Sequence, residues 1–255
     1  MTMKKINGMR VDAIFFILSI LLFFLWPQLD LIVAGAFFDV ESQRFSGMDM
    51  GWVKFIHAVF AEIQIPMLLL LIAGIILYSK KKQGAKKMRC VYLLCCLLVG
   101  PGLIVNVWLK DNSIGRARPK HVQEFGGDHQ FTPPFVYSGA CEKNCSFTSG
   151  HASVGFVFLA MFWALRQRYY FYFGLALGAM LGWVRIVMGG HFLSDVLFSF
   201  WFVYFSSLWL NRYFYPKMHP SAENENLAQE KEGKEGEGET QDPEITESGD
   251  SSNGG

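Results

Sequence analysis

The sequence RIVMGGHFLSD, residues 185–195, places an arginine, a histidine and an aspartate between two long apolar runs of the chain. His191 and Asp195 are four residues apart, so a helix over this stretch would stack them on one face. A carboxylate behind an imidazole can make that histidine an oriented base or nucleophile. The same spacing also suits a helix cap, in which a neighbouring serine or backbone group satisfies Asp195. This stretch alone leaves both interpretations open.

Apolar runs of about 20 residues, the length that crosses a bilayer, recur along the chain. The 255 residues are 51% hydrophobic and include 24 Phe, which a soluble domain of this size would not normally carry. We therefore predict an all-α, polytopic membrane protein with six transmembrane helices. The expected spans lie at about residues 11–26, 58–78, 90–109, 151–166, 169–188 and 191–210, with a loop and a short interfacial helix between the first two.

The clearest orientation signal is Ser79–Arg89, which carries six lysines and arginines and no acid. Such a loop stays in the cytoplasm by the positive-inside rule. With six spans, both termini are then cytoplasmic, and the basic residues around 166–168 and 212–217 fall on the same side. Four polar residues are expected together at the opposite face: Lys110, His151, Arg185 and His191.

The C-terminal segment differs from the rest of the chain in composition. Between Ser221 and Gly255 there are eleven Asp and Glu against two Lys, and almost no apolar residue. Such a segment cannot bury enough surface to fold. We predict a disordered cytoplasmic tail over residues 216–255, either a solubilising extension or an interaction tail. The rest divides into a cytoplasmic N-terminus, residues 1–10, and a membrane domain, residues 11–215.

Two further polar stretches carry chemistry that suits phosphate. KDNSIGRARP, residues 110–119, holds three cations, and arginine binds phosphate bidentately while lysine adds a point charge. CSFTSGH, residues 145–151, would open the fourth span, where free N–H groups at a helix start bind anions. His151 there can exchange a proton near neutral pH. The plainer alternatives are a basic cluster at lipid head groups and a serine-capped helix with an interfacial histidine.

Together the three stretches resemble the signature blocks of the type 2 phosphatidic acid phosphatase (PAP2) superfamily, which is related to the vanadium haloperoxidases. The resemblance covers about residues 55–210. The first block departs from the pattern by one residue, because seven residues instead of six separate Lys110 from Arg118. The resemblance implies a PAP2-like helical bundle and a phosphatase that needs no metal or other cofactor.

The resemblance also implies a role for each matching residue. His191 would attack phosphorus to form a phosphohistidine, and Asp195 would orient its imidazole. His151 would protonate the leaving group and then activate water. The phosphoryl oxygens would be held by a set of cations and backbone groups: Lys110, Arg118, Arg185, Ser149, Gly150 and, as a further candidate, Arg116.

The five cysteines form two sets. Cys90, Cys95 and Cys96 lie in an apolar run and are expected to be buried, inert thiols. Cys141 and Cys145 flank a polar tripeptide and can close a short disulfide in an oxidising compartment. No histidine or further cysteine lies near them at zinc spacing, so we expect no metal there.

An outward-facing site at the ends of membrane helices predicts a phosphorylated lipid as substrate. The cysteine loop leading into residues 146–153 resembles the lipid A phosphatase branch, which removes the 1- or 4′-phosphate. That resemblance implies a bacterial inner-membrane protein whose site faces the periplasm. Alternatives with the same chemistry are an undecaprenyl pyrophosphate phosphatase, a phosphatidylglycerophosphate or phosphatidate phosphatase, and a lipid phosphotransferase.

A proton-coupled transporter is an alternative from another class, but its ionisable groups would be expected near the membrane midplane and not at one end. The lipid substrate and the bilayer are the expected partners, and we expect no nucleic-acid partner.

Overall fold

The computed structural model describes residues 5–6, 9–110 and 114–220. The chain divides into two compact units, Met1–Met218 and His219–Gly255. The second unit, with nearly all of the predicted acidic tail, falls almost wholly outside the described residues. The architecture that can be described is therefore that of the first unit.

Helices make up most of the first unit. They are α1 (Val11–Leu25), α2 (Leu29–Gly35), α3 (Gly51–Ala61), α4 (Gln64–Lys80), α5 (Gly84–Leu97), α6 (Gly150–Phe156), α7 (Met161–Leu165), α8 (Arg168–Val187) and α9 (Leu193–Met218), with η1 (Ser46–Met48), the π-helical η2 (Leu98–Lys110), η3 (Pro119–His121), η4 (Gln123–Phe125) and η5 (Val157–Ala160) between them. Two short antiparallel pairs accompany the helices: β1 (Lys5–Ile6) with β2 (Met9–Arg10), and β3 (Phe38–Asp39) with β4 (Arg44–Phe45). The predicted all-α class is confirmed.

Four helical segments of the described chain are long and apolar enough to cross a membrane: Gly51–Lys80, Gly84–Lys110, Arg168–Val187 and Leu193–Met218. α1 and α2 are bent by 81° and would form a fifth span only if they are taken together. The segment Gly150–Leu165 is apolar but shorter. Each of the six predicted spans therefore contains a helix, but only four or five segments have the length and composition of a crossing.

α5 continues into η2, whose wider turns begin at Leu98 and contain Gly100-Pro101-Gly102. Proline removes a backbone donor from the helical ladder, and π-helical turns are a common way of accommodating such a disruption. The combined helix ends at Lys110, which it carries to the end of the bundle where α6 begins.

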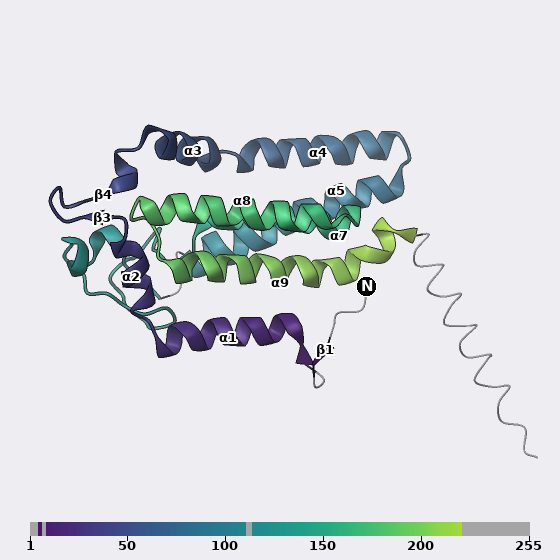
Figure 1. Cartoon of the computed structure of the whole chain (residues 1–255). Helices are drawn as coiled ribbons and strands as arrows, with labels where there is room; N and C mark the ends of the chain where they lie inside the picture. The colour runs from purple at the N-terminus through teal and green to yellow at the C-terminus, as the bar shows by residue number, and fades with distance from the viewer. Residues whose placement is uncertain (1–4, 7–8, 111–113, 221–255) are drawn as a thin grey trace, which may run out of the picture. The chain divides into compact units, whose positions relative to one another are not determined.

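α9 runs through the middle of the bundle, between α1 and α8 (Figure 1). Glycines let α6 and α8 approach closely, because a Cβ on Gly155 would lie 2.6 Å from the Cα of Gly178. Small residues at such contacts allow membrane helices to pack backbone against backbone. The packing brings the start of α6 and the end of α8 beside the start of α9.

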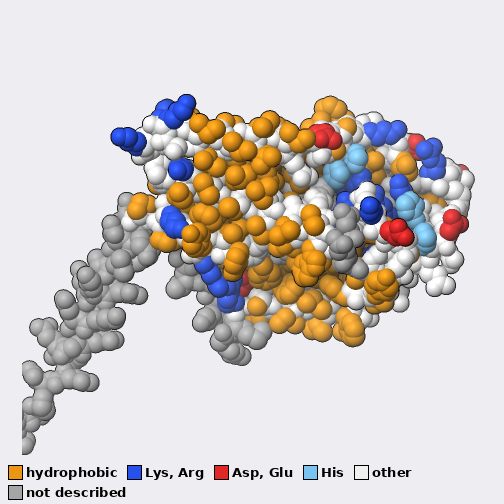
Figure 2. Space-filling view, turned by 180° about the vertical axis from the view of Figure 1, so that it is seen from behind, with side chains coloured by type: hydrophobic (Ala, Val, Ile, Leu, Met, Phe, Trp, Pro, Cys, Tyr) orange, Lys and Arg blue, Asp and Glu red, His pale blue; other side chains and the backbone are white. Residues whose placement is uncertain are grey.

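Charged side chains gather at the two ends of the first unit, with a band of apolar side chains between them (Figure 2). The turn between α4 and α5, which carries the basic run Ser79–Arg89, lies at one end, and α2 with the β3–β4 hairpin lies at the other (Figure 1). Leu69 and Leu70 of α4 are 60% and 73% exposed within the band. An apolar band of this kind suits lipid contact, so the arrangement is that of a membrane protein.

Candidate active site

The loop that joins α8 to α9 places His191 at the centre of the site. Gly189 has a φ of +63°, and a Cβ there would lie 2.4 Å from the ring of Phe45. A Cβ on Gly190 would lie 2.4 Å from Nη2 of Arg185. The two glycines therefore let the loop turn between an aromatic ring and a guanidinium, which no larger side chain would allow.

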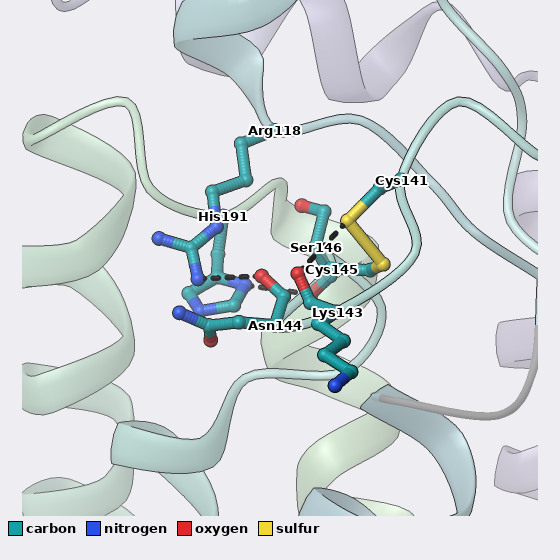
Figure 3. Close-up of a disulfide and its surroundings, with 7 residues drawn as sticks. All are labelled: Arg118, Cys141, Lys143, Asn144, Cys145, Ser146 and His191. Carbon is teal, nitrogen blue, oxygen red and sulfur yellow. Dashed lines mark hydrogen bonds between the residues drawn. A yellow bond between two sulfur atoms is a disulfide. The ribbon is translucent and has the colours of Figure 1, made fainter.

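The hydrogen bond of His191 defines its tautomer. Its Nδ1 lies 2.7 Å from the backbone oxygen of Ser146 (Figure 3). A carbonyl oxygen can only accept, so Nδ1 carries the proton and Nε2 presents a lone pair. Burial lowers the pKa of His191 below its ordinary value, and the charge of Arg185 acts in the same direction against the opposing effect of Asp195. The imidazole is thus neutral and oriented, a state in which Nε2 can act as a nucleophile.

Asp195 is held from three sides, and its Oδ2 lies 3.6 Å from Nδ1 of His191. Arg116 donates to Oδ1 at 2.8 Å, and the hydroxyl of Ser146 donates to Oδ2 at 2.5 Å. The backbone N–H of Phe192 donates to Oδ2 at 2.8 Å. Asp195 therefore caps the start of α9 and also stands behind the imidazole, so the two interpretations of the sequence are compatible.

Three cationic side chains lie around His191 and His151, although His191 itself is buried. The guanidinium of Arg118 lies beside the imidazole and donates to the backbone oxygen of Asn144 at 2.7 Å (Figure 3). Arg185 is 7% exposed, and its Nε makes no hydrogen bond within the described chain. Nζ of Lys110 would lie 3.6 Å from a Cβ on Gly150. These three side chains come from different elements and converge on one end of the bundle.

His151 stands at the first turn of α6, within the field of Arg185 and Lys110. Its Nε2 is buried and, like Nε of Arg185, has no hydrogen-bond partner among the described residues. Buried polar atoms left without a partner are costly, and they are expected where a polar ligand binds. Two such atoms among converging cations indicate an anion site.

Two of the predicted phosphate ligands have other contacts. Arg116 is fully buried, and its donors are directed to Thr132, Ser194, Asp30 and Asp195, away from the cation cluster. The N–H of Ser149 donates to the backbone oxygen of Asp195 at 3.3 Å, while its hydroxyl caps α6 at Ala152. In this arrangement the donors of Arg116 and the N–H of Ser149 are taken up by protein acceptors. Their role as phosphate ligands stays a prediction.

Two residues near the site were not anticipated from the sequence. His57 of α3 stacks on His151, with ring centroids 4.7 Å apart and planes 18° apart. Lys120 follows the first block, and partial burial together with the charges of Arg118 and Arg185 lowers its pKa. His57 lies outside all three blocks, so its place at the end of a span was the only signal. For Lys120 the signal was its position directly after Pro119.

The cysteines form the two predicted sets, but of the three thiols expected to be buried only Cys96 is, while Cys90 and Cys95 are partly exposed. Cys141 and Cys145 are joined by a disulfide in the loop that leads into Ser146 (Figure 3). Cys90, Cys95 and Cys96 are free thiols of α5. Among the described residues, no group of three or more His, Cys, Asp or Glu is placed to hold a metal ion.

Comparison with known proteins adds independent evidence. The PAP2 superfamily matches residues 88–219. A lipid A 4′-phosphatase of Francisella tularensis subsp. novicida is 39% identical over 192 residues, covering 72% of this chain and 86% of the relative. A lipid A 4′-phosphatase of Rhizobium leguminosarum is 39% identical over 118 residues, 45% of this chain and 49% of the relative. A lipid A 1-phosphatase of Rhizobium etli is 35% identical over 135 residues, 49% of this chain and 55% of the relative.

No solved structure matches the chain significantly. The family match covers more than half of the chain, and it includes all three signature blocks. The site geometry, with an oriented histidine among converging cations, agrees with that match. The chain belongs to the PAP2 superfamily.

Proposed function

We propose that this chain is a lipid A phosphatase that removes a phosphate through a covalent intermediate on His191. The observation that carries the mechanism is the Nδ1 hydrogen bond to Ser146, which leaves the lone pair of Nε2 for attack on phosphorus. The 4′-phosphate is the preferred target, because the Francisella 4′-phosphatase aligns over more of both chains than the 1-phosphatase of Rhizobium etli does.

The first chemical step joins Nε2 of His191 to phosphorus as the bond to the sugar oxygen breaks. The imidazole gains positive charge in this step, and Asp195 stabilises that charge from behind. Ser146 holds the Nδ1 proton, so the ring does not have to reorient during attack. Positioning and electrostatic stabilisation are the main means by which proteins accelerate phosphoryl transfer.

His151 supplies the proton for the leaving sugar oxygen, and it later accepts one from the water that cleaves the phosphohistidine. The charges of Arg185 and Lys110 lie close to this imidazole. A bound phosphate neutralises them and favours the protonated ring. The acid form of His151 is therefore favoured when the substrate is in place.

Lys110, Arg118 and Arg185 hold the phosphoryl oxygens and offset the charge that develops on them. These side chains supply the positive charge that a metal ion supplies in other phosphatases, so the reaction needs no cofactor. Nε of Arg185, which has no partner within the described chain, is directed to the bound phosphate. Gly150 leaves room beside Nζ of Lys110, which a side chain at that position would narrow.

The site faces the periplasm of a bacterium, and six helices cross the inner membrane with both termini in the cytoplasm. The support is the basic turn between α4 and α5, which lies at the end of the bundle opposite the site (Figure 1). Such a turn stays in the cytoplasm. A lipid of the outer leaflet then presents its head group to the cation cluster without leaving the membrane.

The test measures phosphate release from lipid A bisphosphate in detergent micelles, with mass spectrometry to identify the phosphate removed. His191→Ala is expected to lose at least about 1,000-fold in kcat, since it removes the nucleophile. Arg44→Gln, a change in an exposed residue of the β3–β4 hairpin, serves as the control. Full activity of His191→Ala would contradict the mechanism, and loss of phosphate to a second lipid would indicate a phosphotransferase.

A further inference from the structure

A closed set of buried hydrogen bonds links α2 to the start of α9 behind His191. Nη1 of Arg116 donates to Oδ1 of Asp195 and to Oγ of Ser194, each at 2.8 Å. Nη2 of Arg116 donates to Oδ2 of Asp30 at 2.8 Å. Ser194 closes the set, because its N–H and its hydroxyl both donate to Asp30, at 2.8 and 2.5 Å. All four of these side chains are 0% exposed.

We propose that Arg116 and Asp30 are positioning residues of the phosphatase reaction, which act on His191 through the carboxylate of Asp195. The inference rests on the proposed function. Arg116 holds Oδ1 of Asp195, so the carboxylate presents its other oxygen, Oδ2, toward the imidazole. Without that donor the carboxylate would be held through Oδ2 alone, by Ser146 and Phe192, and its orientation behind the nucleophile would be less firmly fixed.

Asp30 determines how much of the Asp195 charge faces the imidazole. Asp30 accepts three hydrogen bonds from Arg116 and Ser194, which favours its ionised form. With both carboxylates ionised, the set of two carboxylates and one guanidinium carries a net negative charge beside a histidine that becomes positive during the reaction. If Arg116 paired with Asp195 alone, the pair would be neutral. Because Asp30 also pairs with the guanidinium, Arg116 neutralises the charge of Asp195 only in part, and the remaining negative charge acts on His191.

The surroundings strengthen this electrostatic coupling. The rings of Phe192 and Phe131 lie 4.2 and 5.4 Å from Cζ of Arg116 and exclude water from its faces. In such a low-dielectric site, charges interact more strongly than at a surface. Asp30 belongs to α2, and it lies outside residues 88–219, the part of the chain that the superfamily matches. The N-terminal helices therefore contribute to the site through this residue.

Besides Asp195, the charged or titratable groups with the largest effect on His191 within the described residues are Arg185 from α8, Arg118 from the loop before η3, and His151 from α6. These groups are unchanged in the variants that test the inference. A shift in the ionisation of His191 would therefore report on the buried set alone.

The experiment follows kcat, KM and the acid limb of the kcat/KM profile with lipid A bisphosphate in micelles. Asp30→Asn and Ser194→Ala are each expected to lower kcat by about 10- to 100-fold with little change in KM, the range for residues that orient a reacting ligand. The acid limb of Asp30→Asn should move to lower pH, because Arg116 then satisfies Asp195 alone and less negative charge faces His191. The limb of Arg116→Gln should move to higher pH, because the full carboxylate charge then faces the imidazole.

The matched control is the exposed ion pair of Arg44 and Asp49, where Arg44→Gln and Asp49→Asn should leave the activity and the acid limb unchanged. Thermal unfolding in detergent separates folding from catalysis. If Arg116→Gln does not fold, the kinetics of Asp30→Asn and Ser194→Ala still test the positioning role. Lower unfolding temperatures with normal kcat and an unmoved acid limb in both variants would overturn the positioning role.

The outcomes also separate this inference from the proposed function. Full activity of His191→Ala would contradict the proposed function and this inference with it. An inactive His191→Ala beside normal kinetics of Asp30→Asn and Ser194→Ala would overturn only the positioning role.

Discussion

Replacing Gly190 by alanine tests whether the position of the Arg185 guanidinium limits the rate. A Cβ at this position would lie 2.4 Å from Nη2 and 2.7 Å from Cζ of Arg185, whereas ordinary contact begins near 3.4 Å. The guanidinium must therefore move by about 1 Å, and a displacement of that size in a phosphate-binding group can cost roughly 100-fold in rate. That loss corresponds to about 2.7 kcal/mol in the activation barrier.

The stability of Gly190→Ala should change far less than its activity. The backbone of Gly190 lies outside the left-handed region, and the group that must move is the far end of a long side chain. We expect a cost of about 1 kcal/mol in unfolding free energy, at the low end for an overpacked site. Gly189→Ala should behave in the opposite way, since its φ of +63° and its contact with the Phe45 ring penalise folding.

The assay for Gly190→Ala compares phosphate release per folded molecule with thermal unfolding in the same detergent. Gly51→Ala is the matched control, because a Cβ there meets nothing within 4 Å. The expected result is a kcat/KM about 100-fold below that of the control. A kcat/KM equal to the control in a folded Gly190→Ala protein would refute the assignment of Arg185 to the phosphate.

Four further predictions concern separate parts of the chain. If His57 acts by stacking on His151, His57→Ala should lose about tenfold in kcat and His57→Phe should keep most of it. Equal losses in both variants would mean that the imidazole of His57 is required and not only its stacking. Burial lowers the pKa of His191, so the neutral nucleophile persists below the ordinary pKa of 6.5, and the acid limb of kcat/KM should lie below that pH. Replacing Cys141 and Cys145 together by serine should lower the unfolding free energy by about 2 kcal/mol and should also lower kcat. If thiol labelling of the original protein is the same with and without reductant, the disulfide is absent. Truncation after Pro220 should leave specific activity unchanged, as measured on purified protein, because the removed segment has the composition of a disordered tail.

Local spacing carried most of what could be predicted about the site. His191 and Asp195 lie about one helical turn apart, so their spacing in the sequence is enough to predict that they lie together. His151 lies at the start of an apolar run, so its place at the end of a helix can also be predicted from one segment of sequence. The convergence of Lys110 and Arg185 followed from counting spans, since both fall where an apolar run meets a polar stretch.

The partners of Asp195 could not be predicted in the same way. Asp30 and Arg116 lie far from it along the chain. The packing of α2 against α9 brings Asp30 to it, and the loop before η3 brings Arg116. A buried arginine and an exposed phosphate-binding arginine look alike in sequence, which is why Arg116 was expected among the phosphate ligands. The same holds for His57, whose stacking on His151 depends on how α3 lies against α8.

The buried set also explains why the segment that carries the three blocks is not the whole catalytic unit. Residues 88–219 contain Arg116 and Asp195 but lack Asp30. A chain reduced to that segment would leave Nη2 of Arg116 and the N–H of Ser194 without their acceptor on Asp30, and a donor that stays buried without a partner costs about 1–3 kcal/mol. It would also leave the Arg116–Asp195 pair neutral, so that less negative charge would support the imidazolium of His191. With the positioning role proposed for Asp30, the bent α1–α2 segment belongs to the active site without supplying any of the proposed phosphate ligands.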